Sequence, residues 1–337
     1  MEGHVLPRNP RPERKLTMRR FVLALVAACL ALAPARAQSV ADKYPDKSIR
    51  IIVPFAPGGS VDTLGRLLAQ RMQENWGQSV VVENRPGAAN MIGTGAVANA
   101  APDGYTLLIA VSTHATNPGL QAKVPYDGLK DFAPIALLAR TPVVLYAHPS
   151  FPATDIKSLI AIGKAKSHTL NFGSGGVGTM THLVGEMLKL QAGIEMLHIV
   201  YRGGTPALND LLAGHLPLQF ATVAQALPQY KAGQLRALGI SSATRYASVP
   251  EIPTFNEQGL DLVVNEWYGL LAPAGTPKPI VDKLNAEMKR IVGLPGMGDR
   301  LAAIELIHST PQELESFIRG ETERWGALIR KLGLRAD

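Results

Sequence analysis

Residues 49–72 read IRIIVPFAPGGSVDTLGRLLAQRM, and residues 169–190 repeat their local design as TLNFGSGGVGTMTHLVGEMLKL. Each stretch runs from a β-rich segment through a glycine-rich loop into an amphipathic helix. The start of a helix carries unpaired backbone N–H groups and about half a positive charge. Glycines let a ligand approach those groups closely. Two such helix starts, about 120 residues apart, favour a protein that clasps an anion between two lobes.

Apolar β-rich runs alternate with helical patterns along the rest of the chain. Near-continuous apolar runs are typical of parallel strands that are buried on both faces. The alternation therefore predicts an α/β fold, with helices covering both sides of each sheet. The expected strands span residues 49–55, 79–83, 106–111, 143–148, 170–173, 196–201, 216–221 and 235–241. The expected helices span residues 61–75, 91–100, 154–166, 179–191, 204–213 and 224–232.

The C-terminal part of the chain is also expected to be helical. Thr276 and Pro277 predict one helix start, with threonine as N-cap and proline in the first turn. Residues 310–313, TPQE, form a capping box that opens a long helix through Arg330, and Gly333 lies just past its end. The apolar side of this helix predicts packing against a sheet. It consists of Leu314, Phe317, Ile318, Trp325, Leu328 and Ile329.

The first 37 residues predict a cleavable signal peptide. A basic region at residues 18–20 precedes an apolar core at residues 21–32, which is too short for a membrane span. Residues 35–37, ARA, form an A-x-A cleavage site before Gln38. Two alternatives stay open. Translation starts at Met1 or at Met18, and residues 26–29, VAAC, resemble a lipoprotein signal that ends at Cys29.

Removal of this segment changes the charge of the protein. Seven basic and two acidic residues fall within residues 1–37, so the rest of the chain carries only +2 of the total +7. The basic character of the whole chain therefore does not indicate a nucleic-acid partner. Cys29 is the only cysteine, so residues 38–337 must be held by an ordinary core without disulfides. This length suits two domains.

The first glycine loop, residues 55–62, leads directly into a helix. Ser60 is the expected N-cap, and Asp62 falls in the first turn, where the helix dipole favours a negative charge. Gly58 and Gly59 are adjacent, which is more than a cap needs. The loop is therefore interpreted as ligand-binding, with a structural turn as the alternative.

The second glycine loop, residues 173–178, matches the dinucleotide pattern G-x-G-x-x-G, and Glu195 follows about twenty residues on. Its place in the middle of the chain, the short strand before it and the predicted export argue against a dinucleotide. What remains is a helix start that receives an anion, with hydroxyl donors from Ser174, Thr179 and Thr181. The N–H groups after Gly178 are expected to cradle a carboxylate, and no cofactor is expected.

Two polar segments follow other predicted strands. Residues 112–117, STHATN, come directly after the strand at 106–111. Ligands of open α/β sheets bind beyond the carboxyl ends of strands, so this segment is either a pocket lining or a solvated loop. Residues 201–204, YRGG, follow another strand end, where Arg202 can pair with a carboxylate or simply lie on the surface.

No catalytic or metal-binding pattern is visible in the sequence. His182 and Glu186 are four residues apart, but no third ligand follows at metal spacing and there is no H-E-x-x-H. The G-x-S-x-G pattern of a nucleophilic serine is also missing, and His198, in an apolar strand, is interpreted as a core histidine. The sequence therefore predicts a protein that is not an enzyme, with no metal site.

Eight segments, in this order, resemble the Bug-type solute receptors of tripartite tricarboxylate transporters. The similarity runs from about Tyr44 to the C-terminus. Each motif is weak by itself, but together they are highly specific. The segments are VPFAPGGSVD, VVENRPGAANMIG, PDGYTLL, NFGSGGVGTMTHLVGEML, VYRGGTPALNDLLAGHL, LRALGISSATR, PTFNEQGL and APAGTPKPIVDKLN.

The resemblance implies a type II periplasmic binding-protein fold, in which two α/β domains joined by crossing strands hold a carboxylate in the cleft between them. Domain 1 is expected over residues 44–141 plus 245–337, and domain 2 over residues 142–244. The implied ligand-binding residues are Pro57, Gly58, Gly59, Ser60 and Asp62 in the first lobe, and Ser174, Gly175, Gly178, Thr179 and His182 in the second. Thr113, His114, Asn117, Tyr201 and Thr222 are expected at the same cleft.

The resemblance also implies a function. The protein is expected to be a monomeric periplasmic receptor that captures a small organic carboxylate and delivers it to the permease subunits of a membrane transporter. Members that take amino acids often carry an Asp after the stretch at residues 216–220, whereas this chain has Ala221, Thr222 and Val223, which favours a plain carboxylate. The alternatives are an exported α/β enzyme of the hydrolase kind and a binding protein that feeds a sensor.

Overall fold

The computed structural model describes residues 1, 3–4, 40–165, 170–301 and 303–336. The expected signal peptide, its cleavage site and Cys29 lie outside the described residues. Lys43–Asp337 form one compact unit, which α2 (Val40–Lys43) precedes. Within the described residues, no helix combines the length and the apolar character that a membrane span requires.

One half of the compact unit is built on parallel strands. β1 (Ile49–Val53) pairs with β2 (Val80–Asn84) on one side and with β3 (Thr106–Val111) on the other. β9 (Asn265–Pro273) then pairs antiparallel with β3. β1, β3 and β9 are almost wholly buried, as expected for strands with helices on both faces, whereas only Val80 of the edge strand β2 is buried.

The other half repeats this arrangement. β5 (Asn171–Ser174) lies between β6 (Leu197–Val200) and β7 (Leu218–Thr222), and all three are parallel. β8 (Arg236–Ile240) closes the group by pairing with the long strand β4.

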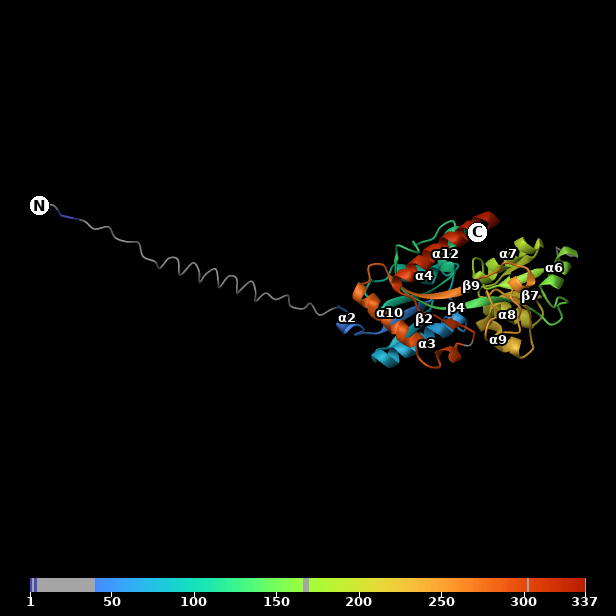
Figure 1. The fold of residues 1–337 in the computed structure, drawn as a ribbon, viewed down its shortest axis with the longest axis horizontal. Coiled ribbons are helices and arrows are strands. Elements are labelled where there is room, and N and C mark those ends of the chain that lie inside the picture. Colours follow the sequence, from blue (N-terminus) through green and yellow to red (C-terminus); the bar gives the residue numbers. More distant parts are fainter. Residues whose placement is uncertain (2, 5–39, 166–169, 302, 337) are drawn as a thin grey trace. The chain divides into compact units, whose positions relative to one another are not determined.

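β4 (Phe132–Ala147) and β9 join the two halves (Figure 1). The first part of β4 pairs antiparallel with β9, and β10 (Glu305–Leu306) pairs with it there as well. Its last five residues pair with β7 and β8. In the described part of the chain the strands therefore form one ten-stranded sheet, in the order β2-β1-β3-β9-β4-β7-β5-β6, with β8 and β10 attached to β4.

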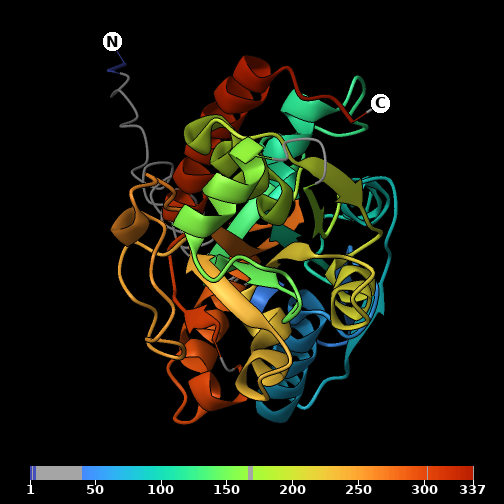
Figure 2. The same ribbon diagram turned by 90° about the vertical axis from the view of Figure 1, so that its right-hand side faces the viewer.

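Helices cover both faces of this sheet. Figure 2 shows α12 (red) and α3 (blue) on opposite sides of the strands. Their bounds are α3 (Ser60–Trp76), α4 (Met91–Ala98), α5 (Thr113–Leu120), α6 (Ile156–Ala165), α7 (Met180–Ala192), α8 (Gly204–Leu212), α9 (Val223–Lys231), α10 (Lys278–Val292), α11 (Met297–Arg300) and α12 (Pro311–Leu332), with a 3-10 turn, η2, at Asn256–Gln258.

The long C-terminal helix packs on the cores of both halves. Leu314 and Ile318, near its start, are buried with Trp267 of β9. Trp325 and Ile329, about two to three turns further on, are buried in the cluster that surrounds β5 and β7. The expected packing of this helix is therefore confirmed, and it bridges two groups of core residues. The domain boundaries at residues 141/142 and 244/245 stay a prediction.

The α/β class is confirmed, and each expected strand and helix is present, with the predicted bounds for the strand at 106–111 and shifted ends for the others. Sequence patterns missed the first part of β4, all of β9, β10 and α5. Of the two interpretations of residues 112–117, the solvated loop is wrong, because Thr113–Leu120 is a helix whose first five residues are buried. Its sequence, THATNPGL, has poor helix propensity. Close packing on α12 holds it, with Gly119 against the backbone of Gly326.

Two of the three expected helix caps are shifted. The N-cap of α3 is Gly59, and Ser60 is already helical. The N-cap of α10 is Pro277, while the Thr276 hydroxyl donates to the carbonyl of Pro273. The capping box of Thr310 and Glu313 is confirmed, with both reciprocal hydrogen bonds present and Gly333 as the left-handed C-cap.

Candidate functional site

The starts of four helices meet around one cavity of about 140 Å³. α3 belongs to the first half of the sheet, and α7, α8 and α9 belong to the second. The first N–H groups of a helix have no partner inside the helix, so the cavity is lined by partial positive charge. Its lining consists of Phe55, Ala56, Pro57, Gly59, Ser60, Val61, Val111, Gly175, Thr179, Thr181, Arg202, Gly203, Gly204, Thr205, Pro206, Thr222, Gln225, Glu266 and Tyr268.

Six of the eight residues of the first glycine loop line this cavity, and the two others, Gly58 and Asp62, are hydrogen-bonded to each other. The Ser60 hydroxyl shares a 2.9 Å hydrogen bond with the Tyr268 hydroxyl. Asp62 points away and accepts from the backbone N–H of Gly58 and from the side chain of Arg66. Burial opposes the ionisation of Asp62, but these hydrogen bonds outweigh it and lower its pKa. Asp62 therefore anchors the loop and does not line the cavity.

The second glycine loop is divided in the same way. Gly175 and Thr179 line the cavity, and Thr179 is the N-cap of α7. The N–H of Gly178 donates to Nδ1 of His182 over 3.2 Å, and its carbonyl accepts from Thr116. The Ser174 hydroxyl lies 2.7 Å from Nε2 of His198. The polar atoms of Gly178 itself thus have protein partners, and the expectation that the N–H groups after Gly178 cradle a carboxylate stays a prediction.

The imidazole rings of His182 and His198 stack on each other and are hydrogen-bonded to this loop. The ring centroids of His182 and His198 are 4.1 Å apart. Burial, together with the neighbouring charges of His198 and Lys189, lowers the pKa of His182 to about 3. Burial and Lys189 lower the pKa of His198 to about 4. Both rings are thus neutral at neutral pH, which lets Nδ1 of His182 accept the Gly178 hydrogen bond.

The polar residues that follow β3 are also structural. His114 is buried between Tyr126 and Phe132, and its Nε2 lies 2.7 Å from the Gly128 carbonyl. Burial lowers the pKa of His114 to about 4. Thr113 accepts from the Asn90 side chain, and Asn117 donates to the carbonyl of Ala89. None of these three predicted site residues lines the cavity.

Tyr201 does not line the cavity either, because its hydroxyl donates to Asp210 over 2.7 Å. The cavity thus brings together six of the fifteen predicted site residues. They are Pro57, Gly59, Ser60, Gly175, Thr179 and Thr222.

Among these six residues, Thr222 has a buried side-chain oxygen without a hydrogen-bond partner in the described part of the chain. It ends β7 and is the N-cap of α9, and its side chain is 6% exposed. Its Oγ1 has no hydrogen-bond partner among the described residues. Nε2 of the neighbouring Gln225 also lacks one there. Buried polar atoms are nearly always paired, so these two indicate a polar partner in the cavity.

Sequence reasoning missed the contribution of β9 to the site. Glu266 and Tyr268 reach the cavity from this strand, which no sequence pattern had indicated. Glu266 is buried and accepts from both the N–H and the hydroxyl of Ser112, over 2.9 Å each. Burial raises its pKa to about 7 against the effect of these donors. Arg202, noted in the sequence only as a possible carboxylate partner, also lines the cavity.

This arrangement is suited to binding a polar ligand through hydrogen bonds and charge. Helix starts, hydroxyl-bearing residues, one arginine and one glutamate line the cavity. In the described residues, no three His, Cys, Asp or Glu side chains gather into a group that could hold a metal ion.

The chain is similar to known proteins over most of its length. Residues 64–334 match the family described as tripartite tricarboxylate transporter family receptor. A UPF0065 protein of Pseudomonas sp. strain P51 is 37% identical over 323 residues, which cover 95% of this chain and 96% of that protein. The protein BugT of Bordetella pertussis is 35% identical and covers 93% of this chain and 98% of its own length.

Solved structures are similar over most of the chain. The periplasmic binding protein BugD is 34% identical, with a TM-score of 0.82 over 87% of this chain and 99% of that one. An R. palustris protein with adipate is 31% identical, with a TM-score of 0.83 over 87% and 99%. MatC from Rhodopseudomonas palustris, with bound malate, is 32% identical, with a TM-score of 0.80 over 85% and 100%. The expected periplasmic binding-protein fold is therefore confirmed.

Proposed function

Because the chain belongs to the family of tripartite tricarboxylate transporter receptors, we propose that its cavity binds a small organic carboxylate for delivery to the permease subunits of such a transporter. Two similar structures hold adipate and malate, which supports a carboxylate as the ligand. The function of a receptor requires binding and release, without chemical change of the ligand. This agrees with a site that is rich in hydrogen-bond donors.

The observation that carries this proposal is the meeting of four helix starts around a buried hydroxyl with a free hydrogen-bonding capacity. Helix starts favour anions, and Thr222 Oγ1 has no partner within the described part of the chain. In this proposal the carboxylate lies between Gly59 and Ser60 on one side and Gly175 and Thr179 on the other. The cavity of about 140 Å³ suits a small acid, since an apolar cavity of about 150 Å³ holds benzene.

The same family membership supports a place outside the cytoplasm. BugD is a periplasmic binding protein by its description. We infer that this chain is exported to the periplasm, that residues 1–37 are removed and that the receptor begins at Gln38. Intact-mass measurement of the exported protein tests this inference. A mass that corresponds to a lipidated Cys29 would contradict it.

The ligand position can be tested with a pair of substitutions at Gly59. Its φ of −85° is ordinary, and an added Cβ meets nothing within 4 Å. Gly59→Asp places a negative charge at the N-cap of α3, where Asp and Asn are both good caps. We expect the folded variant to lose at least a hundredfold in carboxylate affinity by isothermal calorimetry, because two like charges meet in a shielded site.

Gly59→Asn is the matched control, since it has the same shape without the charge. It is expected to retain most of the affinity, and circular dichroism should show both variants folded. Ligands for the titration come from mass spectrometry of acids that co-purify with the protein and from a thermal-shift screen of small carboxylates. Equal binding by the two variants would mean that the anion does not lie at this helix start.

A further inference from the structure

We propose that Glu266 is a specificity-determining residue, which accepts a hydrogen bond from a hydroxyl or ammonium group that the bound acid carries beside its carboxylate. This inference rests on the proposed function, since it concerns the same cavity. It predicts that the receptor prefers acids with such a donor over plain acids of the same chain length.

The position of Glu266 follows from the alternation of side chains along β9. Glu266 and Tyr268 are two residues apart and both line the cavity. Trp267 between them points to the opposite face, where it packs edge-on against Phe317 of α12. β9 lies between β3 and β4 in the sheet, so the carboxyl group is held on a rigid central strand.

The hydrogen bonds of Glu266 define it as an acceptor. Oε1 accepts from the N–H of Ser112 over 2.9 Å and from the N–H of Trp267 over 3.3 Å. Oε2 accepts from the Ser112 hydroxyl over 2.9 Å. Backbone N–H groups can only donate, and a carboxylate offers about four acceptor sites. About one acceptor site therefore remains, on a side chain whose residue lines the cavity.

Nothing in the described part of the chain forms an ion pair with this carboxylate. Glu266 is only 8% exposed, and a buried carboxylate is costly unless it is fully paired. The titratable and charged groups that interact with it or share its cavity are Glu321 on α12, Tyr268 on its own strand and Arg202. Glu321 has the same charge and disfavours ionisation further. A donor on the ligand would supply the missing partner.

The absence of an acidic residue after β7 led to the expectation of a plain carboxylate. Position 222 is indeed a threonine, but β9 brings an acidic side chain to the same cavity from 44 residues further along the chain. An acid with a donor group can then place its carboxylate at the helix starts and its donor at Glu266.

This arrangement predicts that binding and proton release are coupled. In the free protein Glu266 has a pKa of about 7, so near neutral pH it is partly protonated. A ligand donor stabilises the ionised form and lowers this pKa, so binding releases a proton and strengthens as pH rises. A second ligand carboxylate at this point would do the opposite.

The test uses calorimetry with butyrate, 2-hydroxybutyrate, 2-aminobutyrate and succinate at pH 6 and pH 8. We expect at least one of the two donor-bearing acids to bind at least about tenfold more tightly than butyrate at pH 8. Its affinity should rise by about tenfold from pH 6 to pH 8. Which of the two acids gains tells whether a hydroxyl or an ammonium group is the donor.

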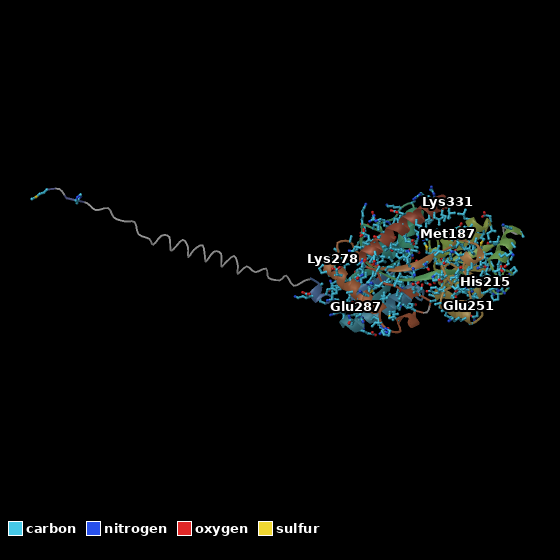
Figure 3. The ribbon with its side chains drawn as sticks, viewed as in Figure 1. Met187, His215, Glu251, Lys278, Glu287 and Lys331 are labelled. Atoms are coloured by element: carbon cyan, nitrogen blue, oxygen red, sulfur yellow. The ribbon has the colours of Figure 1, made fainter. Side chains whose placement is uncertain are left out.

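Glu266→Gln keeps the shape of the side chain and should remove both the preference and the pH dependence. The matched control is Glu251→Gln, an exposed glutamate that does not line the cavity. Figure 3 labels Glu251 at the other end of the compact unit from Lys278 on α10. The Glu251→Gln variant should behave like the parent protein. Ser112→Ala removes one donor to Glu266 and should move the midpoint of the pH dependence upward.

Two outcomes would overturn the inference without touching the receptor function. One is equal binding of butyrate and both donor-bearing acids. The other is an affinity that falls as pH rises, or a pH dependence that survives Glu266→Gln in a variant shown to be folded by circular dichroism. A parent protein that binds none of the four acids would overturn both the inference and the proposed function.

Discussion

Gly178 and Gly59 belong to equivalent loops, but their surroundings differ completely. Sequence alone suggests Gly178 as the position where an acidic side chain would repel a ligand. There, φ is +81°, and an added Cβ would collide with Cδ1 of Leu120 and lie 3.3 Å from Oγ1 of Thr116. Any side chain at 178 therefore tests packing, whereas Gly59 is open and tests the ligand.

We expect Gly178→Ala to lower the free energy of unfolding by about 1–3 kcal/mol, because it adds both backbone strain and a collision. Urea unfolding measures this loss, and calorimetry should find the ligand affinity of the folded variant within about twofold of the parent. Gly193→Ala is the control, since Gly193 has φ of +61° but nothing within 4 Å of an added Cβ. It should cost only about 1 kcal/mol. Equal losses for the two variants would contradict the collision.

At the scale of one element, the start of α12 is fixed by its own capping box. The Thr310 hydroxyl accepts from the N–H of Glu313, whose carboxylate accepts from the N–H of Thr310 over 2.7 Å. We expect Thr310→Ala to cost about 1 kcal/mol in urea unfolding, because the first N–H groups lose their partner. Thr310→Ser keeps the hydroxyl and should cost only a few tenths of that. A loss below about 0.3 kcal/mol for the alanine variant would show that water replaces the cap.

At the scale of the whole molecule, the two halves share a strand and a helix. β4 pairs with β9 along its first part and with β7 and β8 along its last residues. α12 buries Leu314 in one cluster and Trp325 in another. We expect residues 43–337 to unfold in a single calorimetric transition whose measured enthalpy equals the van 't Hoff enthalpy. Two resolved transitions would mean that the halves are energetically independent.

A variant of the bridging helix gives this expectation a second measurement. Trp325 is 1% exposed, and its Nε1 donates to Glu321. Trp325→Ala should lower the free energy of unfolding by about 3–5 kcal/mol. The whole transition is expected to move to lower temperature. A shift confined to part of the transition would argue against one cooperative unit.

Elements that depend on neighbours in the chain could be predicted. The strand–loop–helix units, the capping box at Thr310 and the α/β alternation all result from residues within a few turns of one another. α5 and β9 could not be predicted in this way. α5 has poor helix propensity and depends on the contact of Gly119 with α12, and β9 is held by pairing with strands that lie over 100 residues away in the chain.

The sequence by itself determined the α/β class, the two glycine loops and the family of receptors, because each is written in local patterns and their order. Only the tertiary structure decided which side chains face the cavity. Glu266 lines the cavity because β9 pairs between β3 and β4. Gly178 does not line it, and its N–H donates to Nδ1 of His182. The direction of a side chain relative to a distant ligand depends on contacts that close only when the chain has folded.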